Sequence, residues 1–594
     1  MGKKTWGKLI VIGLCAVMFV GCSRKREESG SIRKTGNTEG ASAHGGPYKE
    51  EITIDVFDDQ ANFQGEQAGW FAKIVKDKFN MKLNIIAPNI AGGGDTLYQT
   101  RTAAGNLGDL IITNADGGRL HDLVSAGLLL DMTPYLSGCD MLNKNEEAIA
   151  DATALAGKDG VWAIPSEISN QPATEPCDAL EPTNAPSLRW DLYGQVGYPE
   201  IKTMEGLLPV LSDMQKEAGK SESGKTVYAI SLFRDWDNEI MQNAAGFCAL
   251  YGYEPQGFAM AKADGSDVQS VIDPDGIYVR VLKFLYDANQ QGLLDPESSE
   301  QDFDTLASKY QDGAVLYSMW PWFGAGEYNT LKRTAQGKGF ATAEIQDMEC
   351  VTYGSMPKGK FSPSIMIGSR TQDPQRLVDF INWLYSPEGI EMSCAASLSS
   401  CGPQGLTWEL DGSGKPKLTD FGIKALIEQE EDLIVPEEWG TGTWKDGVSA
   451  LNFKTAGLVD VNESNGVCYN YQRWEDYHKQ AETKLSKDWS GRHGGAFAAL
   501  EYLTDNHMLI VRPGSNYATP EYETDIQTIK EQCKAVIIEN SWRMIFARNQ
   551  EEFDSLLKDM QATVNGLGYK KALDVDMENV RERFAAEAQI SDSY

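Results

Sequence analysis

Residues 51–57 read Glu-Ile-Thr-Ile-Asp-Val-Phe, and their alternation of apolar and polar side chains is typical of a β-strand with one buried face. A helical pattern follows, and residues 81–86 return to the spacing of a strand. Residues 109–113 (Asp-Leu-Ile-Ile-Thr) form a short apolar run typical of a buried strand. Strands that alternate with helices predict an α/β fold with a parallel, doubly wound sheet.

Polar side chains follow two of these strands at the point where each strand ends. Asp58, Asp59 and Asn62 come after the first strand, and Asn114 comes after the third. Ligands of such sheets bind at the carboxyl ends of the strands, so these residues are candidates for ligand binding. The alternative for the first three is that they cap the next helix.

Length and charge limit the possible functions. The chain has 594 residues, which is more than one ordinary domain holds, so at least two lobes are expected. The formal net charge is −32, from 86 Asp and Glu against 54 Lys and Arg. Binding to nucleic acid or to anionic lipid requires a basic surface, so the charge argues against both partners.

The N-terminus resembles a bacterial lipoprotein signal peptide over residues 1–22. Lysines precede an apolar run at residues 9–20, which is shorter than the ~20 residues that span a bilayer. The run ends in Phe-Val-Gly-Cys, similar to a lipobox although Phe19 stands where Leu is usual, which implies lipidation of Cys22. Residues 23–50 are polar and predict a disordered tether. An ordinary signal peptide or a short anchor is the alternative.

The sequence predicts no metal, no cofactor and no catalytic residue. None of the eight cysteines after Cys22 lies in a CxxC pair, and there is no GxSxG or HExxH motif. Acidic pairs occur in residues 273–276 (Asp-Pro-Asp-Gly) and 574–576 (Asp-Val-Asp), but neither completes a twelve-residue calcium loop.

Several short motifs occur in the order known from one family. They are residues 105–112 (GNLGDLII), 127–134 (GLLLDMTP), 162–165 (WAIP), 189–203, 292–296 (GLLDP), 373–389 and 402–412 (GPQGLTWELDG). On these motifs the chain resembles the extracellular solute-binding lipoproteins of bacterial ABC importers, in the group that includes maltose-binding protein. It is most similar to the long Gram-positive oligosaccharide binders. Gly108 stands where the family has Pro, and residues 420–540 match less well.

The resemblance implies a two-lobed periplasmic-binding-protein-like fold. Each lobe would be a doubly wound sheet flanked by helices, and a ligand would be held in the cleft between lobes that close on it. The hinge crossings are expected near residues 164–168, 355–362 and 396–402. The first lobe would comprise residues 51–165 plus 362–398, and the second residues 168–355 plus 400–594.

A sugar site needs aromatic rings for the apolar face of each sugar and polar groups for its hydroxyls. Trp320 and Trp322 follow a predicted strand, and the resemblance places Trp322 where the group has a stacking tryptophan. Trp236 and Asp235 follow another short strand, and Glu167 lies beside the first crossing. The alternatives are core positions for the tryptophans at 320 and 322 and an exposed turn at residues 235–236.

The resemblance implies a substrate-binding lipoprotein that captures a carbohydrate and delivers it to an ABC permease. It would be a monomer, anchored by its lipid at the extracytoplasmic face of the cell membrane. One alternative is a surface enzyme acting on polysaccharide, because 86 acidic residues offer many carboxylate pairs. Another is a peptide- or signal-binding lipoprotein of the same fold, since acidic lobes suit a cationic peptide.

Overall fold

The computed structural model describes residues 48–593 except 89, 91–93, 179 and 396–398. The predicted signal peptide with Cys22, and residues 23–47 of the predicted tether, lie outside the described residues. The tether ends earlier than residue 50, because Tyr48 already packs on the folded part. The Arg376 guanidinium lies 4.4 Å from the centre of the Tyr48 ring, and the Tyr48 hydroxyl donates to Asp379.

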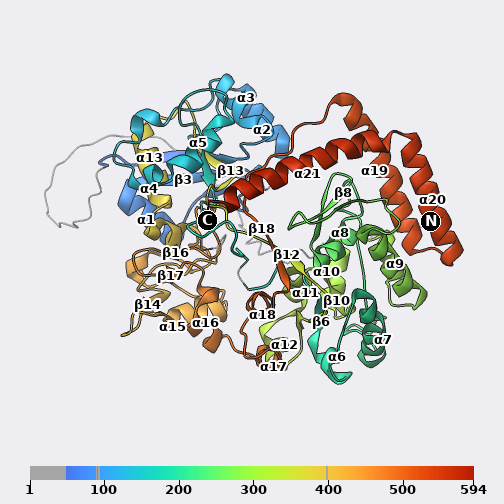
Figure 1. Ribbon diagram of the computed structural model, residues 1–594. Helices are drawn as coiled ribbons and strands as arrows, with labels where there is room; N and C mark the ends of the chain where they lie inside the picture. The colour runs from blue at the N-terminus through green and yellow to red at the C-terminus, as the bar shows by residue number, and fades with distance from the viewer. Residues whose placement is uncertain (1–47, 89, 91–93, 179, 396–398, 594) are drawn as a thin grey trace, which may run out of the picture. The chain divides into compact units, whose positions relative to one another are not determined.

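A six-stranded mixed sheet forms the centre of the first folded part (Figure 1), in the order β2-β3-β1-β4-β13-β5. Its strands are β1 (Ile52–Asp58), β2 (Gly65–Glu66), β3 (Met81–Ile86), β4 (Leu110–Thr113), β5 (Ile164–Ser166) and β13 (Lys360–Ile367). Strand β1 pairs in parallel with β3 and β4, whereas β13 runs antiparallel to β4 and β5. The carboxyl ends of β1 and β4 therefore meet at one edge, as the sequence predicts.

Alternate residues of these strands enter two different cores, one on each face of the sheet. Val56 and Ile112 pack in the core that includes side chains of α1 (Gly69–Phe79) and α13 (Pro374–Leu384). Phe57 and Ile111 pack in the other core, with side chains of α2 (Gly94–Ala103) and α3 (Arg119–Ser125). Helices α4 (Asp140–Lys144), α5 (Glu146–Ala154) and α14 (Pro387–Ser393) also belong to this part. The sheet is covered by helices on both faces, which confirms the α/β prediction.

Residues 401–474 pack in the first core, although the sequence analysis places residues 400–594 in the second lobe. The Trp70 ring stacks on Trp444 with centres 4.8 Å apart, and the Trp70 indole N–H donates to the Trp444 carbonyl at 3.0 Å. Trp408 and Trp474 are buried in the same core. This segment is needed to cover the large aromatic rings of α1. The last crossing between cores consequently lies between residues 477 and 485, not near 396–402.

The elements of residues 401–480 are short. They are β14 (Trp408–Leu410), β15 (Pro416–Leu418), α15 (Asp420–Gly422), β16 (Val461–Asn462), β17 (Val467–Cys468) and α16 (Glu475–Gln480).

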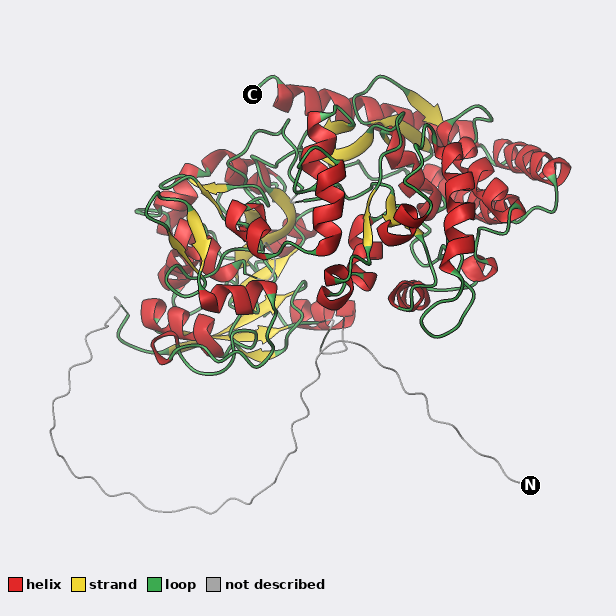
Figure 2. Cartoon of the chain, turned by 90° about the horizontal axis from the view of Figure 1, so that it is seen from below, coloured by secondary structure: helices red, strands yellow, loops and turns green. Residues whose placement is uncertain are grey.

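The second core gathers buried side chains from residues 185–350 and 485–572. Helices predominate there (Figure 2): α6 (Trp190–Gln195), α7 (Leu207–Ala218), α8 (Gln242–Cys248), α9 (Ile277–Gln290), α10 (Phe303–Gln311), α11 (Pro321–Tyr328), α12 (Leu331–Ala335), α17 (Lys484–Arg492), α18 (Ala499–Asp505), α19 (Thr524–Ile545), α20 (Gln550–Gly566) and α21 (Tyr569–Ser591). The strands of this part are β6 (Ser187–Arg189), β7 (Tyr253–Gln256), β8 (Ala259–Lys262), β9 (Val268–Ser270), β10 (Tyr317–Ser318), β11 (Phe340–Thr342), β12 (Cys350–Tyr353) and β18 (Leu509–Arg512). No helix among the described residues is long and apolar enough to cross a membrane.

The second part has smaller sheets than the predicted doubly wound one. Strands β10, β6 and β11 form an antiparallel sheet. The short strand expected before Asp235 and Trp236, at residues 227–232, makes only isolated parallel bridges. In this segment, side-chain oxygens accept hydrogen bonds from backbone N–H groups that a continuous β-ladder would use. The Ala229 N–H donates to the Gln215 amide at 2.7 Å, and the Leu232 N–H donates to the Ser298 hydroxyl at 3.0 Å.

A buried carboxyl makes the stability of the fold depend on pH. Glu391 of α14 is 8% exposed, and burial, with Glu388 nearby, raises its pKa to about 7 despite a hydrogen bond from Asn462 at 3.3 Å. An unfolded Glu has a pKa of about 4.3. Between these values the folded state holds the proton more tightly, so this group lowers the free energy of unfolding as pH rises from about 4.5 to about 7.

Glu391→Gln removes this titration while keeping a carbonyl oxygen for Asn462. We expect the variant to be more stable than the parent by about 1–3 kcal/mol at pH 8, and close to it at pH 5. Urea unfolding at the two pH values measures the difference. Glu409→Gln, at an exposed position, is the control. An advantage of equal size at both pH values would contradict the assignment.

Candidate ligand-binding site

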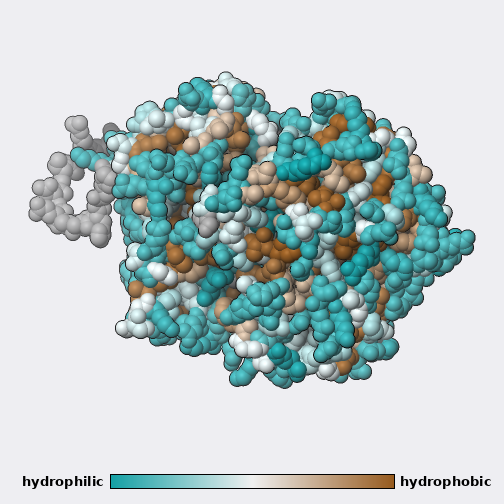
Figure 3. Space-filling model, in the orientation of Figure 1, coloured by the Kyte–Doolittle hydropathy of each residue, from teal (hydrophilic) through white to brown (hydrophobic). Residues whose placement is uncertain are grey.

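Two exposed tryptophans form an aromatic surface over the second core. Trp322 is 48% exposed and Trp236 is 41% exposed. Their rings lie 6.1 Å apart at 20°, and Trp236 stacks on Phe303 at 4.8 Å and 20°. We call this surface, with the rings beneath it, the aromatic platform: Phe233, Trp236, Phe303, Trp320, Trp322 and Phe323. The space-filling view in Figure 3 shows apolar residues reaching the surface in patches among polar ones. Indoles left this exposed are typical of a binding surface.

The start of α11 places the two predicted tryptophans differently. Pro321 is the first helical residue, where its fixed φ favours helix initiation. Trp320, just before it, is only 5% exposed, and its ring lies 5.9 Å from that of Phe233. Trp322, one residue into the helix, is exposed. Trp320 therefore supports the platform from the core, and Trp322 is free to contact a ligand.

Asp235 holds the platform together from its edge. Its carboxylate accepts the backbone N–H of Phe303 at 2.9 Å, at the start of α10. This contact fixes the aromatic ring on which Trp236 stacks. Phe303 itself is a platform residue that sequence reasoning missed, because it follows the helix cap Asp302 and looks like an ordinary first helical residue.

The residues at the end of β1 make mostly internal contacts. Asp58 is completely buried and accepts the backbone N–H groups of Gln60 at 2.8 Å and Asn452 at 3.3 Å. Burial raises the Asp58 pKa to about 7. Asp59 accepts from the Arg119 guanidinium at 3.1 Å. In this conformation Asp58 therefore anchors the segment around residue 452 and presents no oxygen to a ligand.

The other strand-end residues are more accessible. Asn62 is exposed, and Asn114 is half-buried at the end of β4. Asp116, two residues further on, lines a cavity of about 540 Å³. The end of β4 therefore leads into this cavity.

We call this cavity the crossing cavity, because the chain segments that link the two cores surround it. Its lining includes Asp116, Glu167, Cys177, Asp178, Thr183, Tyr353, Ser355, Lys360, Phe361, Ser362, Lys454, Arg512, Asn516 and Tyr517. Tyr353 and Arg512 are partners at the carboxyl ends of the parallel strands β12 and β18. The volume lies within the range of small-molecule sites, and hydroxyls, amides and aromatic rings are all present.

Glu167 carries the main charge contacts of the crossing cavity. Its carboxylate pairs with Lys360 at 2.8 Å and Lys454 at 3.8 Å, and its backbone N–H donates to the Lys454 carbonyl at 2.8 Å. Its φ is +49°, an uncommon conformation for a residue other than glycine and one that recurs at functional sites. The prediction that Glu167 lies at a site beside the first crossing is therefore consistent with its position.

Close backbone contacts hold the crossing segments against each other. A Cβ on Gly354 would lie 1.7 Å from the Ala173 carbonyl oxygen, and one on Gly514 would lie 1.8 Å from that of Ser355. Only glycine fits at these two positions.

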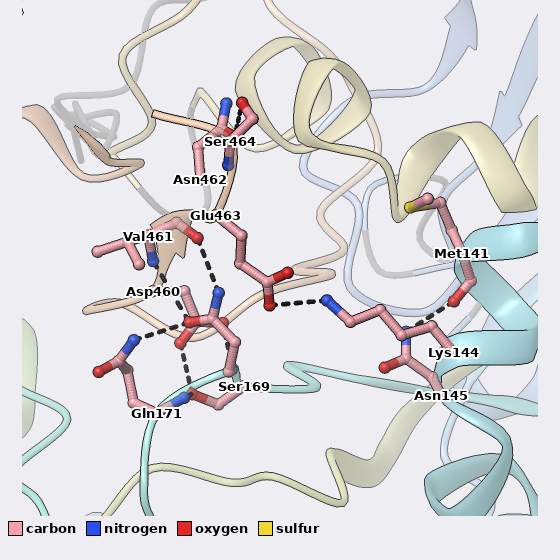
Figure 4. A network of polar contacts seen from close by, with 11 residues as sticks. Met141, Lys144, Asn145, Ser169, Gln171, Asp460, Val461, Asn462, Glu463 and Ser464 are labelled. Atoms are coloured by element: carbon pink, nitrogen blue, oxygen red, sulfur yellow. Dashed lines mark hydrogen bonds and ion pairs between the residues drawn. The ribbon is translucent and has the colours of Figure 1, made fainter. Parts of the chain in front are cut away.

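A polar network braces the segment after Glu167 (Figure 4). The buried Asp460 carboxylate accepts the Ser169 hydroxyl and the Asn170 backbone N–H, the latter at 3.2 Å. The Asn170 amide donates to the Val461 carbonyl at 2.7 Å. Nearby, Lys144 pairs with Glu463 at 2.7 Å. The first crossing is thus fastened to residues 457–463, which belong to the first folded part.

The cavity lining offers no reactive thiolate. Burial, with Asp178 next to it, raises the pKa of Cys177 to about 12, so the thiol stays protonated at neutral pH. Burial also raises the pKa of Asp178, which accepts the Thr352 hydroxyl at 2.7 Å.

Among the described residues no group of three His, Cys, Asp or Glu side chains is placed to hold a metal ion. In the two acidic pairs noted in the sequence, Asp273 accepts the Asp275 backbone N–H at 3.0 Å, and Asp576 pairs with Lys530 at 2.9 Å.

The structure assembles the predicted residues into two groups. Trp236, Trp320, Trp322 and Asp235 share the aromatic platform. Glu167 lines the crossing cavity together with Asp116, two residues after Asn114, whereas the lining residues of this cavity do not include Asp58, Asp59, Asn62 or Asn114. Sequence reasoning missed Tyr353, Lys360, Lys454 and Arg512 of the cavity. Lys454 and Arg512 lie in residues 420–540, where the resemblance is weakest, and the other two gave no signal except their nearness to the predicted crossing at 355–362.

Comparisons with known proteins were made by sequence and by structure. No protein-family model matches the chain, and no curated protein matches it by sequence. Solved structures do match. The ABC-transporter substrate-binding protein FusA of S. pneumoniae, in complex with kestose, is 14% identical, with 90% of this chain and 99% of that chain covered and a TM-score of 0.55.

Two further structures match over similar lengths. The alginate-binding protein AlgQ2 is 11% identical, with 90% of this chain and 98% of that chain covered and a TM-score of 0.53. An extracellular solute-binding protein from Bifidobacterium longum subsp. infantis is 11% identical, with 90% and 98% covered and a TM-score of 0.52. The likeness extends over nearly the whole of each of these proteins. The chain therefore has the α/β fold of the extracellular solute-binding proteins of ABC transporters.

Proposed function

We propose that the protein is the substrate-binding component of an ABC importer and that it captures an oligosaccharide. The observation that carries this proposal is the aromatic platform, with two exposed tryptophans in a chain of this fold. Stacked indoles suit the apolar faces of sugar rings, and the hydroxyl and amide groups of the crossing cavity suit their hydroxyls. FusA was solved with kestose and AlgQ2 is described as alginate-binding, which supports a carbohydrate ligand.

Capture would proceed by closure of the two lobes around the sugar. The first lobe comprises residues 51–165, 362–395 and 399–477, and the second comprises residues 185–350 and 485–591. A ligand shifts the population toward the closed state only if it makes better contacts there. Trp322, Trp236 and Glu167 are the residues we expect to touch the sugar, with Asn62 and Asn114 at the strand ends. These ligand-contacting side chains would be positioned by Asp58, Asp235 and Trp320. Asp59 is held by Arg119.

A panel of purified oligosaccharides tests this proposal by thermal shift. A ligand that binds only the native state raises the melting temperature as its concentration exceeds the Kd. We expect at least one oligosaccharide to raise the melting temperature, and free amino acids and cationic peptides to leave it unchanged. A shift with cationic peptides and none with sugars would favour the peptide-binding alternative.

We propose that Cys22 carries a lipid that anchors the mature protein to the extracytoplasmic face of the membrane, where the permease is. Cys22→Ser removes the thiol that would be lipidated, so we expect the variant to leave the membrane fraction. Cell fractionation with an immunoblot measures this, and Cys15→Ser is the matched control. A Cys22→Ser variant that stays in the membrane fraction would rule out the lipid anchor.

A further inference from the structure

The cations that line the crossing cavity are all paired with carboxylates of the protein. Lys360 and Lys454 share Glu167, at 2.8 and 3.8 Å. Arg512 pairs with Glu587 at 2.8 Å and with Glu254 at 3.3 Å. Two carboxylates therefore already offset the charge of Arg512, through its Nε and Nη1 groups.

The lining has three carboxylates for its three cations, and behind it Glu587 also pairs with Arg583 at 3.5 Å. Asp116 and Asp178 line the cavity in addition to Glu167, and Glu254 and Glu587 lie behind Arg512. An anionic ligand would meet like charges in a partly enclosed space, where they are screened less than in open water. A neutral ligand has no such cost.

The balance of charges in the crossing cavity depends on Glu167. Its side chain is 18% exposed, and its carboxylate contacts both lysines of the lining. Its left-handed backbone and the hydrogen bond from its N–H to the Lys454 carbonyl keep it between Lys360 and Lys454. Without its charge the same position would present two ammonium groups to the cavity.

From these contacts we infer that Glu167 determines the charge of the ligand: together with Asp116 and Asp178 of the same lining it offsets the charges of Lys360 and Lys454, so that the cavity takes neutral oligosaccharides and rejects those with carboxylates, such as uronates. The inference rests on the proposed function, and it adds the class of sugar. An acidic sugar would be rejected because its carboxylate is repelled by the carboxylates of the cavity. Such a repulsive contact adds specificity to that given by attractive contacts.

The test compares tetrasaccharides in pairs that differ only at C6, a hydroxymethyl group in one and a carboxylate in the other. Isothermal titration gives the affinity ratio for the unaltered protein and for Glu167→Gln. We expect the unaltered protein to prefer the neutral member at least tenfold. Glu167→Gln should lower that preference at least fivefold by strengthening binding of the acidic member, and added salt should weaken the gained binding.

Two further variants separate charge from shape. Glu167→Gln combined with Lys360→Gln removes one freed ammonium group, so the gain should shrink. Glu409→Gln, at an exposed position, should leave the ratio as it is. Equal or tighter binding of the acidic member by the unaltered protein, or an unchanged ratio in Glu167→Gln, would overturn the inference and leave the proposed function intact. Absence of binding for every sugar of both classes would overturn the proposed function and the inference with it.

Discussion

Trp322→Ala should weaken the affinity for the captured oligosaccharide by about 1–3 kcal/mol, or roughly 5- to 150-fold in Kd. The ring is 48% exposed and lies nearly parallel to Trp236. Its removal takes away one stacking surface and leaves Trp236 stacked on Phe303 alone. Isothermal titration with a ligand identified in the thermal-shift panel measures the loss.

Matched substitutions show whether the effect is specific to the platform. Trp322→Phe keeps an aromatic ring and should retain part of the affinity. Phe497→Ala removes a ring of similar exposure (43%) that lies against His478 and is not part of the platform. It should leave the affinity unchanged. If Trp322→Ala binds as tightly as the parent, Trp322 is not part of the site.

Asp576→Asn should lower the free energy of unfolding by about 3–5 kcal/mol, because it leaves a buried Lys without its main counter-charge. Lys530 and Asp576 are 2% and 0% exposed at their side chains, and the Lys530 ammonium lies 2.9 Å from both Asp576 oxygens. The same carboxylate accepts the Phe258 N–H and the Tyr522 hydroxyl, both at 2.7 Å. This pair fastens α19 and α21 to the turn between β7 and β8.

A control on the same helix isolates the effect of burial. Asp574 pairs with Lys570 at 2.7 Å, but the two side chains are 61% and 80% exposed. Asp574→Asn should therefore cost less than about 0.5 kcal/mol. In Asp576→Asn the buried Lys530 ammonium keeps only the Glu239 carboxylate, at 3.1 Å, so adding Lys530→Met should recover part of the loss. Chemical unfolding measures all three. Equal costs for Asp574→Asn and Asp576→Asn would contradict the account of the pair.

Local patterns predicted the first sheet well, because its strands bury alternate residues on two faces. The strand predicted at residues 81–86 matches β3, and the strand at 109–113 matches β4 to within a residue. The packing of residues 401–474 was not predictable in this way. Their place in the first core depends on contacts such as Trp70 with Trp444, which join positions far apart in the sequence.

The aromatic part of the candidate site follows from the sequence, and the charged part does not. The sequence places Trp320 and Trp322 directly after a predicted strand, as candidates for the site or for the core, and only the structure separates buried Trp320 from exposed Trp322. Lys360, Lys454 and Arg512 are single charged residues in unrelated segments. Their convergence on Glu167 and its neighbours arises from the crossings of the chain, which no local pattern encodes.

The most direct test is to titrate the purified protein with its oligosaccharide and then to release and weigh the sugar by mass spectrometry. The proposed function predicts saturable binding at one sugar per chain, with the released sugar identical in mass and linkage to the one added. A shortened or otherwise altered sugar, formed in proportion to the protein and to time, would show that the chain is an enzyme and would contradict the central claim.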